Sequence, residues 1–322
     1  MIGGIVRDAS LFETVLKRQE LREILGYFPK YAMRFDYFKD RYALLLLQLA
    51  FEDGVSKRDI RASSFAQLLD KAVVKQLLSL FGGKAVSADD YDWCWPQDVQ
   101  CYHLTLGTWN GNDSSWNQTS RQGFNLVLQL NFSNQHDAAY RRLVDPANER
   151  PFEFFGHPIA KRRHTLAWAR MDIDLDRGEA LIEEIQNDWL REARWAYREA
   201  MRDGESCFFW NSEIRSEDVI RYVTDVLCDY ETTWDEAMLA ATLWFLRREL
   251  GIRKIYYHTH ETGAAMKRIV YRRLPPRSLY TRLPRKFCFE ETGDAPAFIR
   301  RKSRSLVTRR KLSDARFHSL EL

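Results

Sequence analysis

The sequence lacks three features that would assign it to a well-marked class: a paired-cysteine motif, a long hydrophobic run and a strong excess of one charge. Its five cysteines are odd in number and include no C-x-x-C pair, which is typical of thiols kept reduced inside a cell. The longest apolar run, residues 43–50, contains Gln48 and is far too short to span a bilayer. The first residues also lack the basic segment and apolar run of a signal peptide. These absences predict a cytoplasmic protein with no membrane partner.

Charge is balanced overall but unevenly distributed. The 49 Lys and Arg residues against 45 Asp and Glu residues give a formal net charge of +4, so net charge alone does not indicate nucleic-acid binding. Basic residues gather between Lys267 and Lys311. Such a stretch is either a solvated rim or a surface for phosphate groups, so nucleic acid is a possible partner there. Residues 299–322 are predicted to form a basic C-terminal tail.

Hydrophobic periodicity predicts an α+β protein in which a helical N-terminal lobe is followed by a mixed sheet flanked by helices. Apolar residues at helical spacing over 8–82 indicate the lobe, assigned to residues 1–90. Residues 91–298 form the predicted α/β domain. Thr233 and Glu236 have the spacing of a capping box, which predicts that a long helix begins there. The predicted strands are 99–109, 124–132, 152–155, 166–175, 180–186, 252–259 and 286–290, and the predicted helices are 138–144, 188–202, 216–228, 233–251 and 261–271.

Two neighbouring predicted strands carry carboxylates. Alternation places Asp172 and Asp174 on one face of the first strand, and Glu184 and Gln186 on one face of the second. Carboxylates on neighbouring strands can hold a divalent cation, or one of them can have a raised pKa for general-base catalysis. A solvent-facing hairpin is the alternative interpretation. The apolar residues around Glu183 and Glu184 favour a buried strand, where an unpaired charge is costly.

The end of the predicted 252–259 strand carries His258 and His260. In open α/β sheets such strand ends face ligand crevices, so these side chains can line a pocket or relay a proton. Two histidines are too few for a metal site. Farther along, Tyr280 lies between Arg277 and Arg282, where a phenol can donate a proton or contact an anion.

Residues 181–189, Leu-Ile-Glu-Glu-Ile-Gln-Asn-Asp-Trp, are followed by Thr232-Thr233-Trp234 and a long helix. This pattern resembles the EIQSDW motif of domains in large phage-encoded polyvalent proteins. The resemblance covers roughly residues 165–270 and implies a phage-related protein. It brings no activity with it.

The order hairpin, helix, strand, helix, then Leu279-Tyr280-Thr281-Arg282-Leu283 and a strand, resembles the C-terminal half of a GNAT acyltransferase. The resemblance implies an acyl-CoA donor whose pantetheine chain inserts where the 180–186 and 252–259 strands separate. Tyr280 is the matching position for the acid that protonates the departing thiolate. The expected catalytic residues are Glu184, Tyr280, Glu183 and His258, and the expected cofactor-binding residues are Thr232, Thr233, Arg277 and Arg282.

Two other functions remain open for the same residues. A restriction-endonuclease-like nuclease would hold Mg²⁺ on Asp172 or Asp174 together with Glu184-Ile185-Gln186, although Gln stands where such enzymes usually have Lys. The third possibility is a non-enzymatic binding protein or phage-conflict component acting on an unknown small molecule or protein. That interpretation is favoured if bulky side chains fill the crevice near Glu184 and Tyr280.

Overall fold

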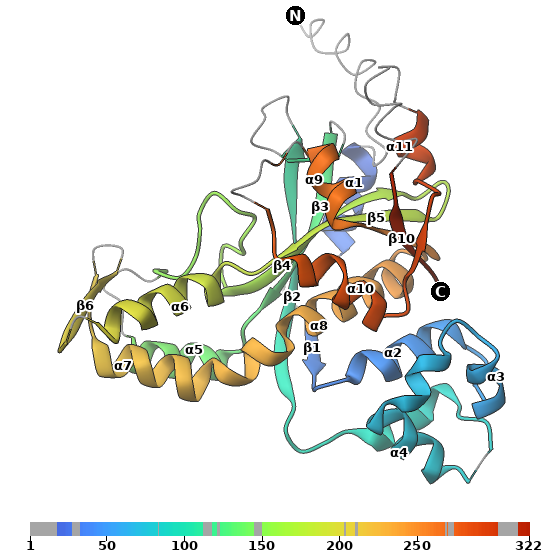
Figure 1. The fold of residues 1–322 in the computed structure, drawn as a ribbon, viewed down its shortest axis with the longest axis horizontal. Helices are drawn as coiled ribbons and strands as arrows, with labels where there is room; N and C mark the ends of the chain where they lie inside the picture. The colour runs from blue at the N-terminus through green and yellow to red at the C-terminus, as the bar shows by residue number, and fades with distance from the viewer. Residues whose placement is uncertain are drawn as a thin grey trace, which may run out of the picture.

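The computed structural model describes an α+β protein built on a mixed sheet with helices on both faces (Figure 1). Within the described residues, the main sheet has eight strands in the order β1-β2-β3-β4-β5-β8-β10-β9, and β6 and β7 form a separate hairpin. Among the described strands, β5 and β8 alone pair in parallel. The residues described are 18–27, 33–82, 84–111, 118–120, 123–144, 150–202, 204–209, 212–267, 269, 274–301 and 315–322.

The strands and helices are interspersed along the chain. The strands are β1 (Met33–Tyr37), β2 (Gln100–Gly111), β3 (Gly123–Asn131), β4 (Thr165–Asp174), β5 (Glu179–Gln186), β6 (Ser206–Phe209), β7 (Ser212–Arg215), β8 (Lys254–His258), β9 (Glu290–Thr292) and β10 (Phe317–Glu321). The α-helices are α1 (Arg18–Tyr27), α2 (Arg41–Ala50), α3 (Lys57–Arg61), α4 (Ala72–Leu80), α5 (Asn134–Leu143), α6 (Trp189–Ala200), α7 (Ser216–Arg221), α8 (Cys228–Trp244), α9 (His260–Lys267), α10 (Arg282–Lys286) and α11 (Ala297–Arg301).

Shorter turns complete the described chain. They are the 3₁₀ segments η1 (Ala66–Asp70), η2 (Ala88–Cys94) and η6 (Arg277–Tyr280), and the π-helical segments η3 (Tyr222–Val226) and η4 (Phe245–Glu249). No helix among the described residues is both long enough and apolar enough to pass through a membrane.

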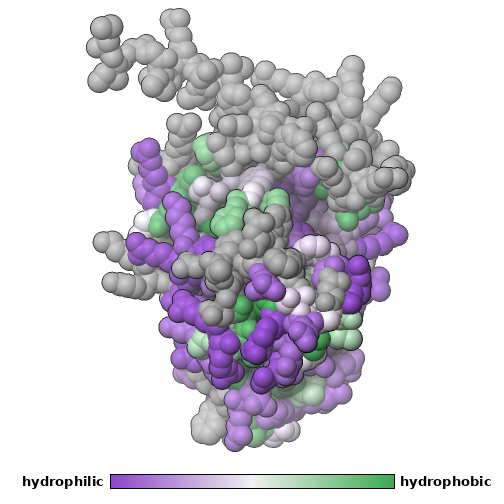
Figure 2. All heavy atoms as spheres, turned by 90° about the vertical axis from the view of Figure 1, so that its left-hand side faces the viewer, coloured by the Kyte–Doolittle hydropathy of each residue, from purple (hydrophilic) through white to green (hydrophobic). Residues whose placement is uncertain are grey.

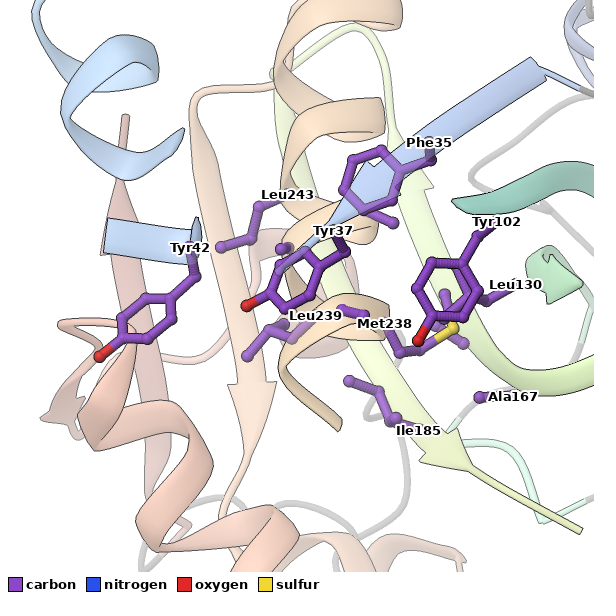
Figure 3. Close-up of a cluster of buried hydrophobic side chains, with 14 of the residues drawn as sticks. Phe35, Tyr37, Tyr42, Tyr102, Leu130, Ala167, Ile185, Met238, Leu239 and Leu243 are labelled. Carbon is purple, nitrogen blue, oxygen red and sulfur yellow. The ribbon is translucent and has the colours of Figure 1, made fainter. Parts of the chain in front are cut away.

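The main core lies between α8 and one face of the sheet (Figure 3). Alternate residues of a strand share a face, so each of the first five strands sends one set of side chains toward this helix. The second half of α8, from Glu236 to Leu243, is buried on all sides and is apolar apart from Glu236 and Thr242. The facing side chains are Phe35, Tyr37, Tyr102, Leu130, Ala167 and Ile185 from the strands, and Met238, Leu239 and Leu243 from α8.

A second, smaller core covers the opposite face near β5, β8 and β10. Leu181 and Tyr256 belong to it, whereas their neighbours Ile182 and Tyr257 belong to the main core. Phe298 of α11 and other residues of the C-terminal segment complete this cluster. The two faces of β5 and β8 are therefore both covered, which explains why these strands are apolar on both sides.

The predicted helical lobe and basic tail both contribute strands to the sheet. Residues Met33–Tyr37, expected to be part of a purely helical lobe, form β1 and pair with β2. Residues Phe317–Glu321, expected to be part of a tail, form β10 between β8 and β9. Each strand is only five residues long, so its alternation was too short to stand out.

Several predicted elements also need correction. Residues 152–155 form turns, not a strand, and the β6–β7 hairpin was not anticipated. Most of the predicted 286–290 strand lies in or after α10, with β9 beginning at Glu290. The predicted helix start at Thr233 is wrong, because α8 begins at Cys228. The hairpin of β4 and β5 and the strands β2, β3 and β8 lie where the sequence places them.

Candidate functional site

Strand β5 changes its pairing on both sides at the same point. On one side Arg170 faces Glu184 and Met171 faces Ile182, so Glu183 is an extra residue that forms a β-bulge. On the other side β5 and β8 stay paired only as far as Ile182 and Tyr257, although β5 continues to Gln186. A bulge re-aims side chains, and here it brings two adjacent glutamates into one polar cluster.

These glutamates belong to what we call the buried charge cluster: Arg170, Glu183, Glu184, His258 and Lys267. Arg170 Nη2 donates to Glu184 Oε2 at 2.5 Å, and Lys267 Nζ lies 4.0 Å from the same oxygen. His258 Nε2 lies 3.1 Å from Glu183 Oε2. All five side chains are buried, so the two carboxylates and two cations balance one another where an unpaired charge would be costly.

The cluster fixes the charge of its members. Burial opposes ionisation of Glu183, but the hydrogen bond with His258 and the charges of Lys267 and Arg170 lower its pKa to about 2. Burial likewise opposes ionisation of Glu184, yet Lys267 and Arg170 lower the pKa of this carboxyl below its ordinary value. Burial is the main cause that lowers the pKa of His258. Both glutamates are therefore carboxylates at neutral pH, and a carboxylate with a lowered pKa is a weak general base.

The place where β5 and β8 separate, beyond Ile182 and Tyr257, is called the fork here, and it is filled by side chains. Lys267 Nζ donates to the backbone oxygen of Glu183 at 2.7 Å and lies 5.9 Å from the ring centroid of Tyr280. Tyr280 stacks on Tyr257 with ring centroids 5.4 Å apart and is almost fully buried. The predicted catalytic residues Glu183, Glu184, His258 and Tyr280 thus lie around one point, but Lys267 occupies the space expected for a pantetheine chain.

The predicted cofactor-binding residues do not lie beside the predicted catalytic residues. Because α8 begins at Cys228, Thr232 and Thr233 lie inside the helix, where their side chains donate to the backbone oxygen of Asp229. Glu236, the supposed partner in the capping box, instead accepts from the Tyr37 hydroxyl at 3.1 Å. No helix N-terminus is available there for a phosphate.

The basic stretch is also partly committed to internal contacts. Arg277 donates to Glu261 on the surface, Arg282 is exposed on α10, and neither lines the pocket described below. Lys267 belongs to the buried charge cluster, and Lys286 pairs with Glu236. Residues 268, 270–273 and 302–311 lie outside the described residues. The described part of this stretch is therefore divided between internal contacts and exposed arginines, and nucleic acid as its partner stays a prediction.

A pocket of about 920 Å³ opens beside the free end of β5. Its cations come from one face of α6, where Arg191, Arg194 and Arg198 follow at helical spacing. Figure 2 shows the end of the molecule that carries α6, α7 and the β6–β7 hairpin, where hydrophilic side chains surround small apolar areas. The pocket is also lined by Glu184 and His157 and by the apolar side chains of Ile185, Leu190, Trp234, Ile269, Leu274 and Leu279.

His157 and the arginines of α6 were not among the sequence-predicted site residues. His157 follows a glycine in a segment of turns, and its contact with Asp188 joins positions that are distant in sequence. The sequence did signal part of this site through the pattern at residues 181–189 that resembles the EIQSDW motif, which we call the EIQ-type motif. Its polar residues Glu184 and Gln186 line the pocket, and its apolar residue Trp189 is buried in the aromatic core.

The acidic pair proposed for Mg²⁺ is divided between separate environments. Asp172 is fully buried, whereas Asp174 accepts the backbone N–H of Arg177 at the β4–β5 turn. Glu184 is already neutralised by Arg170. Within the described ranges no group of three or more His, Cys, Asp or Glu side chains is placed to hold a metal ion. His258 and His260 contact different groups. His258 contacts Glu183, whereas His260 Nε2 lies 3.3 Å from the backbone oxygen of Pro275.

Comparison with protein-family models, with curated proteins and with solved structures gave no match for this chain. The function is therefore argued from the site itself.

Proposed function

We propose that this protein is a GNAT-like acyltransferase that takes its donor, an acyl-CoA, in the α6 pocket. The observation that carries the proposal is the place of the pocket at the unpaired end of β5, directly after the bulge at Glu183. Glu184, the matching position for a catalytic carboxylate, reaches this pocket. The donor would lie along the α6 side of β5, because Lys267 fills the fork on the β8 side.

The composition of the pocket wall supports a ligand with a charged and an apolar part. Three arginines on one face of α6 supply planar donors that suit phosphate groups. Arg194 is partly engaged by Glu231, whereas Arg198 has no hydrogen-bond or ion-pair partner in the described part of the chain. Aliphatic and aromatic side chains cover the space between these arginines and Glu184. Acyl-CoA, with phosphates at one end and a thioester at the other, fits such a wall.

The binding part of the proposal is tested by isothermal titration of acetyl-CoA at two salt concentrations. Arg198→Ala is expected to weaken binding about 10-fold, because a charge-assisted contact to phosphate is lost, and higher salt should weaken the wild type. Arg202→Ala is the matched control, since this arginine follows α6 but does not line the pocket. The absence of binding heat and of a thermal shift in the wild type would rule out the proposal.

A non-enzymatic ligand-binding protein is the second candidate. It is favoured by the filled fork, where Lys267 and Tyr280 leave the predicted catalytic residues almost fully buried. The two candidates differ in turnover. Binding of acetyl-CoA without release of free thiol, in the presence of amines or water, would favour the second candidate over the first.

A further inference from the structure

We propose that His157 is the proton acceptor of the α6 pocket and that Asp188 is its positioning residue. The inference rests on the proposed function and names the base that the buried charge cluster does not supply. Glu184 lines the same pocket, but it is held as an ion pair with Arg170 at 2.5 Å. The base must take a proton from the molecule that receives the acyl group. It must therefore be open to the pocket and must not be held by a cation.

The geometry of His157 and Asp188 is that of an oriented imidazole. His157 Nδ1 lies 2.7 Å from Asp188 Oδ2, so the proton of this tautomer is on Nδ1. The Gln186 amide nitrogen is 3.1 Å from Nδ1 but already donates to Asp188 Oδ1 at 2.6 Å. Nε2 is then the lone-pair nitrogen of the neutral ring. No described group makes a hydrogen bond to it, and the side chain is 22% exposed.

Asp188 is held rigidly behind the ring. Besides His157, its carboxylate is contacted by Trp168 Nε1 at 3.2 Å and by Arg191 Nη2 at 2.8 Å. Burial opposes its ionisation, but the hydrogen bond from His157, the charge of Arg191 and the hydrogen bond from Gln186 lower the pKa of Asp188 below its ordinary value. A buried, ionised carboxylate with this many donors fixes the imidazole in one tautomer.

The ring itself is clamped by aromatic side chains. Trp168 packs edge-on against His157 at 5.4 Å between centroids, and Phe154 does so at 4.6 Å. The clamp limits rotation of the ring, so Nε2 keeps one direction. Since His157 lines the pocket together with Glu184 and Gln186, that direction opens on the space where the thioester end of the donor is placed by our proposal.

The step is simplest with water as the acceptor. The water oxygen forms a bond to the thioester carbonyl carbon while Nε2 of His157 takes one of its protons. When the carbon–sulfur bond breaks, sulfur leaves with the bonding electron pair and receives the proton from the imidazolium. Acetic acid and the free thiol are the products, His157 returns to its neutral form, and the acid then releases its proton to solvent as acetate.

The experiment measures acetyl-CoA hydrolysis by release of free thiol, together with titration of acetyl-CoA into each protein. His157→Gln is expected to bind acetyl-CoA as the wild type does but to lose about 100-fold or more in rate. His103→Gln is the matched control, because His103 lies on β2 and does not line the pocket. Circular dichroism and thermal melting check that each variant is folded.

The possible outcomes separate the two proposals. Binding with an unchanged rate in His157→Gln overturns the role of His157 and leaves acyl-CoA binding intact. Binding without thiol release by the wild type also overturns it and favours the non-enzymatic candidate. If the wild type does not bind acetyl-CoA, the proposed function itself fails, and the base assigned here fails with it.

Discussion

Single buried histidines have different roles in this chain, and His136 illustrates the structural one. It stacks on Phe132 with centroids 3.5 Å apart, and its Nε2 lies 2.8 Å from the Tyr222 hydroxyl. Trp189, from the EIQ-type motif, donates to the same hydroxyl at 2.8 Å. The ring is thus a neutral member of an aromatic core, in contrast to His157, which lines a pocket.

Burial lowers the pKa of His136 to about 4 from its ordinary value of 6.5. The unfolded chain therefore takes up a proton between these two values while the folded chain does not, so stability is full above pH 6.5 and falls as the pH drops toward 4. We expect a loss of up to about 3 kcal/mol from this group.

Urea unfolding at pH 7 and pH 5 measures this effect. His136→Gln should be less stable at pH 7 but should lose less stability than the wild type on acidification. His260→Gln, at a partly exposed position on α9, is the control that should follow the wild type. Equal acid sensitivity of the wild type and His136→Gln would contradict the assignment.

Among elements, the comparison of α5 with α8 shows what a capping pattern can and cannot predict. Ser133 precedes α5 and its Oγ accepts the backbone N–H of His136 at 3.3 Å, as a cap does. Thr233 has the sequence of a cap but lies inside α8, which continues from α7 through the π-helical segment η3. The pattern is local, whereas the start of α8 depends on packing of the preceding segment against the core.

Alanine substitutions compare the cap of α5 with an exposed position inside α8, next to the predicted cap Thr233. Ser133→Ala should lower the free energy of unfolding by about 1 kcal/mol through loss of a cap. Thr232→Ala, at an exposed position inside α8, should be neutral or stabilising by a few tenths of a kcal/mol, because alanine favours helix interiors. Denaturant titration of both variants measures the difference. A larger loss in Thr232→Ala than in Ser133→Ala would indicate that α8 begins near residue 232.

At the scale of the whole molecule, strand β10, near the C-terminus, connects β8 and β9 within the main sheet. It pairs with β8 on one side and β9 on the other, and its residue Phe317 is fully buried against Tyr256. Phe317 also lies 5.5 Å from the ring of His258. The strand therefore supports the wall of the buried charge cluster from the side opposite β5.

Removal of this side chain should affect the whole fold. Phe317→Ala is expected to lower the free energy of unfolding by about 3–5 kcal/mol, the usual cost of a large buried cavity. Glu321→Ala, on the same strand but exposed, is the control and should change stability little. Thermal melting measures both, and a Phe317→Ala variant as stable as the control would place β10 outside the cooperative unit.

The α+β class and most central strands could be predicted because their alternation and apolar runs are local properties. The same is true of the acidic residues on β4 and β5, whose strands were placed correctly. What could not be predicted is how Glu183 and Glu184 are oriented, because strict alternation would put them on opposite faces. The bulge appears only in the strand register between Arg170 and Met171, and it directs both side chains toward one cluster.

The sequence by itself determined which side chains could carry charge and where the β4–β5 hairpin and the strands β2, β3 and β8 run, since both follow from residue type and near-neighbour spacing. The tertiary structure decided which of them meet. Lys267 neutralises the glutamates and fills the fork, α6 supplies the arginines, and the turn at His157 is brought onto Asp188. These contacts join positions far apart in the chain, and only packing of the sheet against its helices brings such positions within a few ångströms of each other.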